Sequence, residues 1–121
     1  MTEQDQWKIE AARTAHGQWL TRLRNAIEYG TSEFAPATVR TDDRCDFGKW
    51  LHGDFPAALR RESIFEEIRA AHARFHALAA EILALALAGK KVQAMEAMEP
   101  RGEFMRLSGA LVLKLAALKR M

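Results

Sequence analysis

The sequence predicts an all-α fold, an antiparallel bundle of the four-helix type with an extra short helix that carries the cysteine. Apolar residues recur at steps of three and four along most of the 121 residues, which is the period of an amphipathic helix. No window shows the sustained alternation of apolar and polar residues that indicates a strand. The connections between the periodic stretches are short, except the first, which favours antiparallel neighbours.

The first helix is expected over residues 2–29, and Gly30 supplies its C-terminal stop. Its apolar stripe consists of Ile9, Ala12, His16, Trp19, Leu20, Leu23 and Ile27. Residues 30–41 hold glycine, proline, serine and threonine, so we expect a connecting loop there.

Two short helices are expected next. Asp42 or Asp43 can cap a helix that carries Cys45 in its first turn and ends at Gly53. A second short helix is expected over residues 56–61, because proline is favoured in a first turn.

A second long helix is expected to begin at Ser63 and to stop at Gly89. Ser63 and Glu66 have the spacing of a capping box and precede an apolar run. The inward stripe of this helix consists of Ile64, Ile68, His72, Phe75, Ala79 and Ile82. A shorter helix over residues 91–98 and a last helix over residues 103–119 complete the predicted bundle.

The composition is that of an ordinary soluble protein, and we expect one domain over residues 1–121. With 49% hydrophobic and 28% charged residues, the chain is not expected to be disordered. A net charge of +2 is too small to indicate a nucleic-acid partner. The chain shows no signal peptide, and no apolar run approaches the roughly 20 residues that span a membrane. A lone cysteine fits a reducing compartment, so we expect a cytoplasmic protein with no membrane partner.

Four side chains on three predicted helices make up a tetrahedral ligand set for Zn²⁺. His16 lies on the first stripe, Cys45 on the short helix, and His72 and His76 are four residues apart on one face of a single helix. Each residue alone also has a plainer interpretation, as a packed histidine or a buried thiol. Taken together, one sulfur and three nitrogens that are expected to lie close to one another favour a metal site over these plainer interpretations.

The neighbours of these residues suit a metal site. At the start of a helix, Cys45 faces unpaired backbone donors and the positive end of the helix dipole, which favour the thiolate and make it the redox-reactive ligand. Trp19, Phe47 and Trp50 are expected to exclude water from the site. Gly48 lacks a side chain where the short helix must approach another helix closely.

Two further groups of polar residues lie near the motif. His52 precedes a helix end and is expected to be a cap or a surface residue. The residues expected near enough to orient a ligating imidazole are Asp42, Asp43 and Asp46.

At these positions the chain resembles the chemoreceptor zinc-binding domain family. The motifs that carry the resemblance are His16-Gly17-Gln18-Trp19, Cys45-Asp46-Phe47-Gly48-Lys49-Trp50 and His72-Ala73-Arg74-Phe75-His76. The resemblance implies a helical bundle, typically a homodimer, that holds zinc through the three histidines and the cysteine. It also implies a sensor rather than an enzyme, which reports zinc or oxidants such as hypochlorous acid. Its output would be a chemotaxis receptor or a diguanylate cyclase that makes cyclic di-GMP, reached by fusion or in trans.

Two other classes of protein are alternatives. A zinc hydrolase needs an open coordination position and a general base, as in a His-Glu-x-x-His helix, whereas here Ala73 holds the second position and Cys45 closes the site. A hemerythrin-like di-iron bundle is suggested by the size and by the spacing of His72 and His76. Two irons need more histidines and bridging carboxylates, and no histidine follows His76.

The last helix predicts self-association. Met105 and Val112 lie beside its main stripe and Leu113 lies nearly opposite, which is more apolar cover than one bundle face requires. We therefore expect a homodimer.

Overall fold

The computed structural model describes residues 1–121 and is helical with no strand, which confirms the all-α prediction. Its elements are α1 (Glu3–Tyr29), α2 (Pro36–Val39), α3 (Asp46–His52), a 3₁₀ turn η1 (Leu59–Arg61), α4 (Ser63–Leu87), α5 (Lys91–Ala97) and α6 (Glu103–Lys119).

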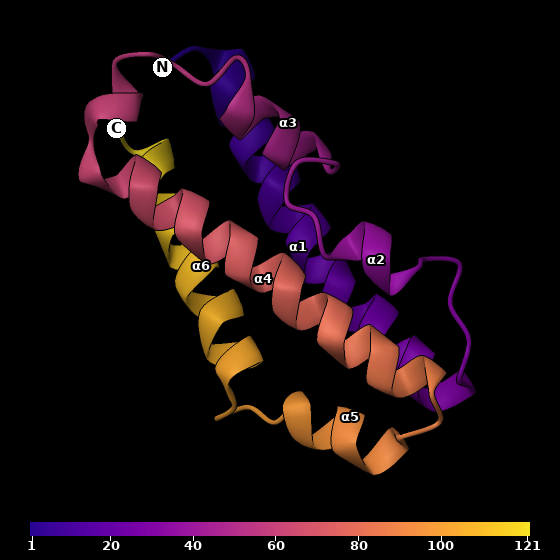
Figure 1. Cartoon of the computed structure of the whole chain (residues 1–121). Coiled ribbons are helices and arrows are strands. Elements are labelled where there is room, and N and C mark those ends of the chain that lie inside the picture. Colours follow the sequence, from indigo (N-terminus) through magenta and orange to yellow (C-terminus); the bar gives the residue numbers. More distant parts are fainter.

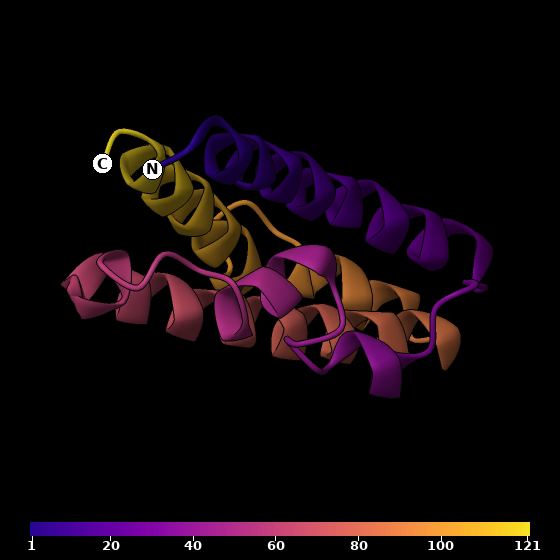
Figure 2. The same ribbon diagram turned by 90° about the horizontal axis from the view of Figure 1, so that it is seen from above.

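The bundle has one leg built from two short helices. Figure 1 shows α1 and α4 running in the same direction, with α6 running back and the segment through α2 and α3 forming the return path between them. Seen from above in Figure 2, α1 and α4 lie on opposite sides of the bundle. The Lys119 ammonium lies 2.9 Å from the Glu10 carboxylate, which pairs the end of α6 with the start of α1. Successive legs of the bundle are therefore antiparallel.

Helix α4 is the centre of the packing, and it contacts α1, α2, α5 and α6. The aromatic rings of Phe75 on α4 and Phe104 on α6 lie 5.1 Å apart at the centre of the core. Ile9 and Leu23 of α1 and Leu111 of α6 are completely buried in the same cluster. By length and hydropathy alone α4 could cross a membrane, but 56% of the apolar window is buried inside the bundle, as is usual for a core helix.

Both ends of α1 follow the prediction. Thr2 caps the helix, because its hydroxyl accepts from the Asp5 N–H and the Asp5 carboxylate accepts from the Thr2 N–H, each at 3.1 Å. Gly30 closes the helix with a φ of 72°, a conformation that glycine adopts without steric cost.

Helix α4 begins at Ser63 as predicted, but the predicted capping box is wrong. Glu62 is the N-cap residue, and no side chain caps the helix. Glu66 forms an ion pair with Arg69 on the next turn instead. The short helix expected over residues 56–61 shrinks to the 3₁₀ turn Leu59–Arg61, since the proline fixes only its own backbone angle.

The segment that leads to the cysteine also differs from the prediction. Part of the expected loop, Pro36–Val39, forms one helical turn that starts on its proline and buries Val39. Neither Asp42 nor Asp43 caps α3, which begins one residue after Cys45; the cysteine is itself the N-cap residue. A single turn carries no apolar periodicity, so the sequence pattern does not reveal it.

Gly48 is required by the chain just before α3, not by another helix as predicted. A Cβ atom at Gly48 would lie 1.8 Å from the Asp42 carbonyl oxygen, far closer than two non-bonded atoms can approach. The missing side chain lets the loop fold back across the first turn of α3.

Replacing Gly48 with alanine is expected to lower the free energy of unfolding by about 1–3 kcal/mol, because the loop or the helix must move. Gly17→Ala is the matched control. Gly17 lies within α1 with no atom near its absent Cβ, so this substitution should add about 0.5–1 kcal/mol. Urea unfolding of both variants measures the difference, and equal stabilities would contradict the assigned role of Gly48.

Candidate metal centre

The structure brings all four predicted donors to one place. His16 comes from α1, Cys45 from the N-cap of α3, and His72 and His76 from successive turns of α4. Their ligand atoms all lie within 4.8 Å of one another. The three imidazoles are buried, and the cysteine is half-buried.

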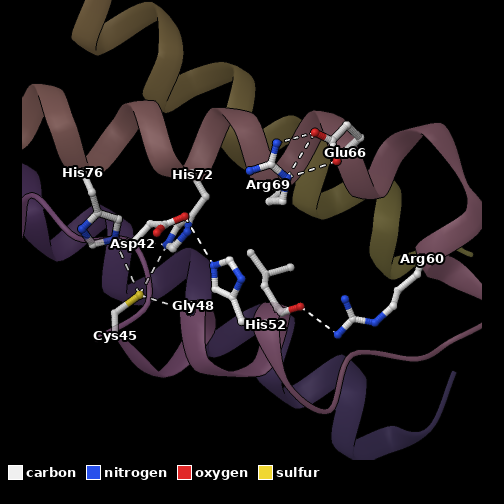
Figure 3. A network of polar contacts seen from close by, with 10 residues as sticks. Asp42, Cys45, Gly48, His52, Arg60, Glu66, Arg69, His72 and His76 are labelled. Carbon is white, nitrogen blue, oxygen red and sulfur yellow. Dashed lines mark hydrogen bonds and ion pairs between the residues drawn. The ribbon is translucent and has the colours of Figure 1, made fainter.

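Three of the distances between donors are close to those around one tetrahedral ion (Figure 3). The Cys45 Sγ lies 3.3 Å from the His72 Nε2 and 3.6 Å from the His76 Nε2, and these two nitrogens lie 3.1 Å apart. Around zinc, with bonds of about 2.0–2.1 Å to nitrogen and about 2.3 Å to sulfur, tetrahedral neighbours are separated by roughly 3.3–3.6 Å. These three donors therefore already lie near the positions that one ion requires, and His16 lies within 4.8 Å of each of them.

Backbone carbonyls orient two of the imidazoles. The His16 Nδ1 lies 2.6 Å from the Ala12 carbonyl oxygen, and the His76 Nδ1 lies 2.9 Å from that of Val39. A carbonyl oxygen only accepts, so in each ring Nδ1 carries the proton and Nε2 keeps its lone pair. This is the tautomer that a metal bound at Nε2 requires. The turn α2, absent from the prediction, thus supplies a contact that positions a donor.

The aspartates expected to orient an imidazole are not the partners seen for these two rings. The Asp42 carboxylate instead lies 3.5 Å from the Nε2 of His52, which ends α3 at the surface as predicted (Figure 3). The His72 Nδ1 is buried without a hydrogen-bond partner. The orienting groups that the sequence did not reveal are main-chain atoms, whose positions depend on tertiary packing.

Burial keeps the histidines neutral. It lowers the pKa of His16 to about 4 and that of His72 to about 2, and it also lowers the pKa of His76. Neutral imidazole is the form that binds metal, so the site is ready for a cation at neutral pH.

The pKa of the Cys45 thiol differs from the prediction that the helix start favours the thiolate. Burial raises the pKa of Cys45 and outweighs the Gly48 N–H, which donates to Sγ at 3.3 Å and favours the thiolate. The helix start alone therefore does not produce a thiolate. A bound cation would, because coordination deprotonates a thiol outright.

Aromatic rings surround the donors in two layers. Phe47 lies edge-on to His16 and His72, with ring centroids 5.8 Å and 5.1 Å apart. Phe75, which was predicted only as a stripe residue, lies edge-on to His16 at 5.0 Å. Trp50 packs behind Phe47 at 5.9 Å. Trp19 is buried against Phe34 at 5.0 Å.

The sequence model of one protein family, the chemoreceptor zinc-binding domain, matches residues 16–83 of the chain. This range begins at His16 and extends past His76, so it includes all four clustered donors. Comparison of the chain with curated proteins and with solved structures gave no match.

Acidification is expected to destabilise the metal-free protein from about pH 6.5 downward. Above this pH each histidine is neutral in both states; below it, the unfolded chain binds protons that the folded His16 and His72 do not. Each such histidine lowers the free energy of unfolding by about 1.4 kcal/mol per pH unit down to its folded pKa. Urea unfolding of chelator-treated protein between about pH 7 and pH 5 measures this slope. A stability that stays constant over this range would contradict the assignment.

Proposed function

The chain belongs to the chemoreceptor zinc-binding domain family, and we propose that it is a sensory domain whose Zn²⁺ is held by the four clustered donors. One observation carries the proposal: a thiol and three imidazoles from α1, α3 and α4 meet within 4.8 Å of one another, and three of these donors lie near tetrahedral spacing. The bound ion would supply the positive charge that stabilises the Cys45 thiolate. Trp19, Phe47 and Trp50 would limit the access of water to this site.

The proposed signal is zinc itself or an oxidant of the hypochlorous acid type. Cys45 is the one sulfur donor of the cluster, and a two-electron oxidant converts its thiolate to a sulfenic acid. Its thiolate gives an electron pair to hypochlorous acid, the hydroxyl group ends on sulfur, and chloride leaves. The sulfenic acid that forms has lost the negative charge that made it a ligand, and three neutral histidines remain.

The two ends of α3 are held differently, which gives the signal a route. At its C-terminal end, Arg60 donates to the carbonyl oxygens of Leu51 at 2.9 Å and Gly53 at 3.0 Å. At its start, Cys45 contacts the histidines of α4 and accepts from the Gly48 N–H. Loss of the sulfur ligand would therefore free the start of α3 while Arg60 keeps its end in place.

The proposed output is a chemotaxis receptor or a diguanylate cyclase in the cytoplasm, reached by fusion or in trans, as the family resemblance implies. The moving surface would be the segment 42–53. We infer a regulatory role without catalysis, supported by Ala73 at the position where hydrolytic zinc helices carry glutamate and by the fourth donor at Cys45. Against a di-iron centre, the cluster includes no carboxylate to bridge two metals.

A homodimer is also part of the proposal. Leu113 of α6 is 72% exposed, and the half-buried Met105 and Val112 lie beside it on a shallow surface that Leu20 of α1 extends. Such an apolar surface suits a second copy of the chain.

Replacing Cys45 with alanine is expected to weaken zinc binding by more than the roughly 10–100-fold that loss of an orienting partner costs, because it removes a ligand. His52→Ala is the matched control, since His52 lies outside the cluster and should leave zinc binding unchanged. Metal analysis and competition with a chromogenic chelator measure both variants. Equal zinc content and affinity in the Cys45 variant and in the unsubstituted protein would overturn the proposed site.

Oxidation of the zinc-loaded protein with one equivalent of hypochlorous acid is expected to release zinc and to speed amide hydrogen exchange over residues 42–53. Exchange in the cores of α1, α4 and α6 should change little, because their buried contacts stay in place. Mass spectrometry confirms that Cys45 is the oxidised residue. If exchange across residues 42–53 is the same before and after oxidation of Cys45, the proposed signal is refuted.

A further inference from the structure

A cavity of about 610 Å³ opens between α1 and α3 and reaches the metal centre. Three of the four donors, His16, Cys45 and His76, form part of its lining. Small-molecule sites usually measure roughly 300–1,000 Å³. Most of this cavity lies outside the cluster of donors and has no part in holding a metal.

The walls of the cavity are largely aromatic. Trp19, Phe47 and Trp50 are buried in its lining, whereas Trp7 is 68% exposed. Ala11 adds a small side chain from α1 and so leaves room between the rings. Indole and phenyl faces favour a flat apolar group.

The charged groups of the cavity favour an anion. Its cationic residues are Lys8, Arg22, Arg44 and Lys49, and its acidic residues are Asp46 and Asp54. None of the four cations takes part in an ion pair. The Lys8 ammonium lies 5.8 Å from the centre of the Trp50 ring, and the Arg22 guanidinium lies 5.0 Å from that of Trp19. These cation–π contacts hold positive charge beside the apolar walls, with hydrogen-bond donors free for a ligand.

We propose that this cavity binds an organic anion of the aryl carboxylate class and that the bound ligand covers the Cys45 thiol. The aromatic part lies among the indole rings, and the carboxylate contacts Lys8 from α1 and Lys49 from α3. The proposed binding depends only on the cavity. Its regulatory effect rests on the proposed function of Cys45: a bound ligand would set how fast reagents reach the thiol.

Calorimetry of the full chain with naphthylacetate, and with naphthylethanol as its uncharged counterpart, tests the binding. The carboxylate is expected to bind at least about tenfold more tightly than the alcohol, because ionised acceptors form the stronger hydrogen bonds. Lys8→Gln and Lys49→Gln should each weaken the binding of naphthylacetate several-fold. Arg101→Gln, a surface control away from the cavity and outside any ion pair, should have no effect. Equal binding of acid and alcohol, or no effect of either lysine variant, would overturn the proposal.

Filling the cavity gives a second, independent test. Ala11 is exposed on α1 and lines the cavity, so Ala11→Leu should fold and bind zinc as before yet lose naphthylacetate binding. Circular dichroism and metal analysis verify the fold and the zinc content. Undiminished binding in this variant would place the ligand elsewhere and refute the proposal.

The rate at which neutral iodoacetamide alkylates Cys45 tests the covering of the thiol. Saturating naphthylacetate should slow the reaction several-fold in the unsubstituted protein and leave it unchanged in Ala11→Leu. An unchanged rate in both would refute the covering. Failure of the zinc site would be seen separately, in the metal content of the Cys45 variant.

Discussion

The fold depends on holding one half-buried thiol and three buried, neutral imidazoles together. A buried polar group without a partner costs about 1–3 kcal/mol, so a cluster of four such groups would favour unfolding unless they are paired. The chain pairs the outer nitrogens of His16 and His76 with carbonyl oxygens, and the inner nitrogens of His72 and His76 face Cys45. A metal ion then satisfies the inner donors at once. Structural zinc can contribute roughly 10–16 kcal/mol to folding, so even a partial loss of coordination is ample to shift a local element of the structure.

This requirement also explains the irregular leg of the bundle. A continuous helix between α1 and α4 would present side chains to the histidines, but it would not place a helix N-terminus beside them. The break between α2 and α3 puts Cys45 at an N-cap and the Val39 carbonyl against the His76 ring. Gly48 then allows the intervening loop to pass across the first turn of α3. The two short helices are thus a consequence of where the sulfur and the carbonyl must lie.

Periodicity and donor spacing were enough to predict the long helices and the residues that cluster. His72 and His76 share a helix face by simple geometry, and His16 lies on an apolar stripe that had to turn inward. What the sequence could not supply was the backbone around them. The turn at Pro36–Val39, the N-cap role of Cys45 and the contact between Gly48 and Asp42 depend on the path of a loop, which leaves no periodic pattern. The prediction of a low thiol pKa was wrong for a related reason. The helix start, with its dipole and backbone donors, can be seen in the sequence, but the depth of burial cannot.

The division of the bundle into three long helices and one broken leg has a consequence for reversibility. The core of large buried side chains is built mainly from α1, α4 and α6, and Phe75 and Phe104 meet within it without any contribution from α3. If Cys45 responds to oxidants as proposed, loosening the start of α3 would leave this scaffold assembled, and sulfenic acid is a form that thiols reduce. On that proposal, a molecule that has responded once would be restored by reduction and used again, with no need for new synthesis or for refolding of the whole chain.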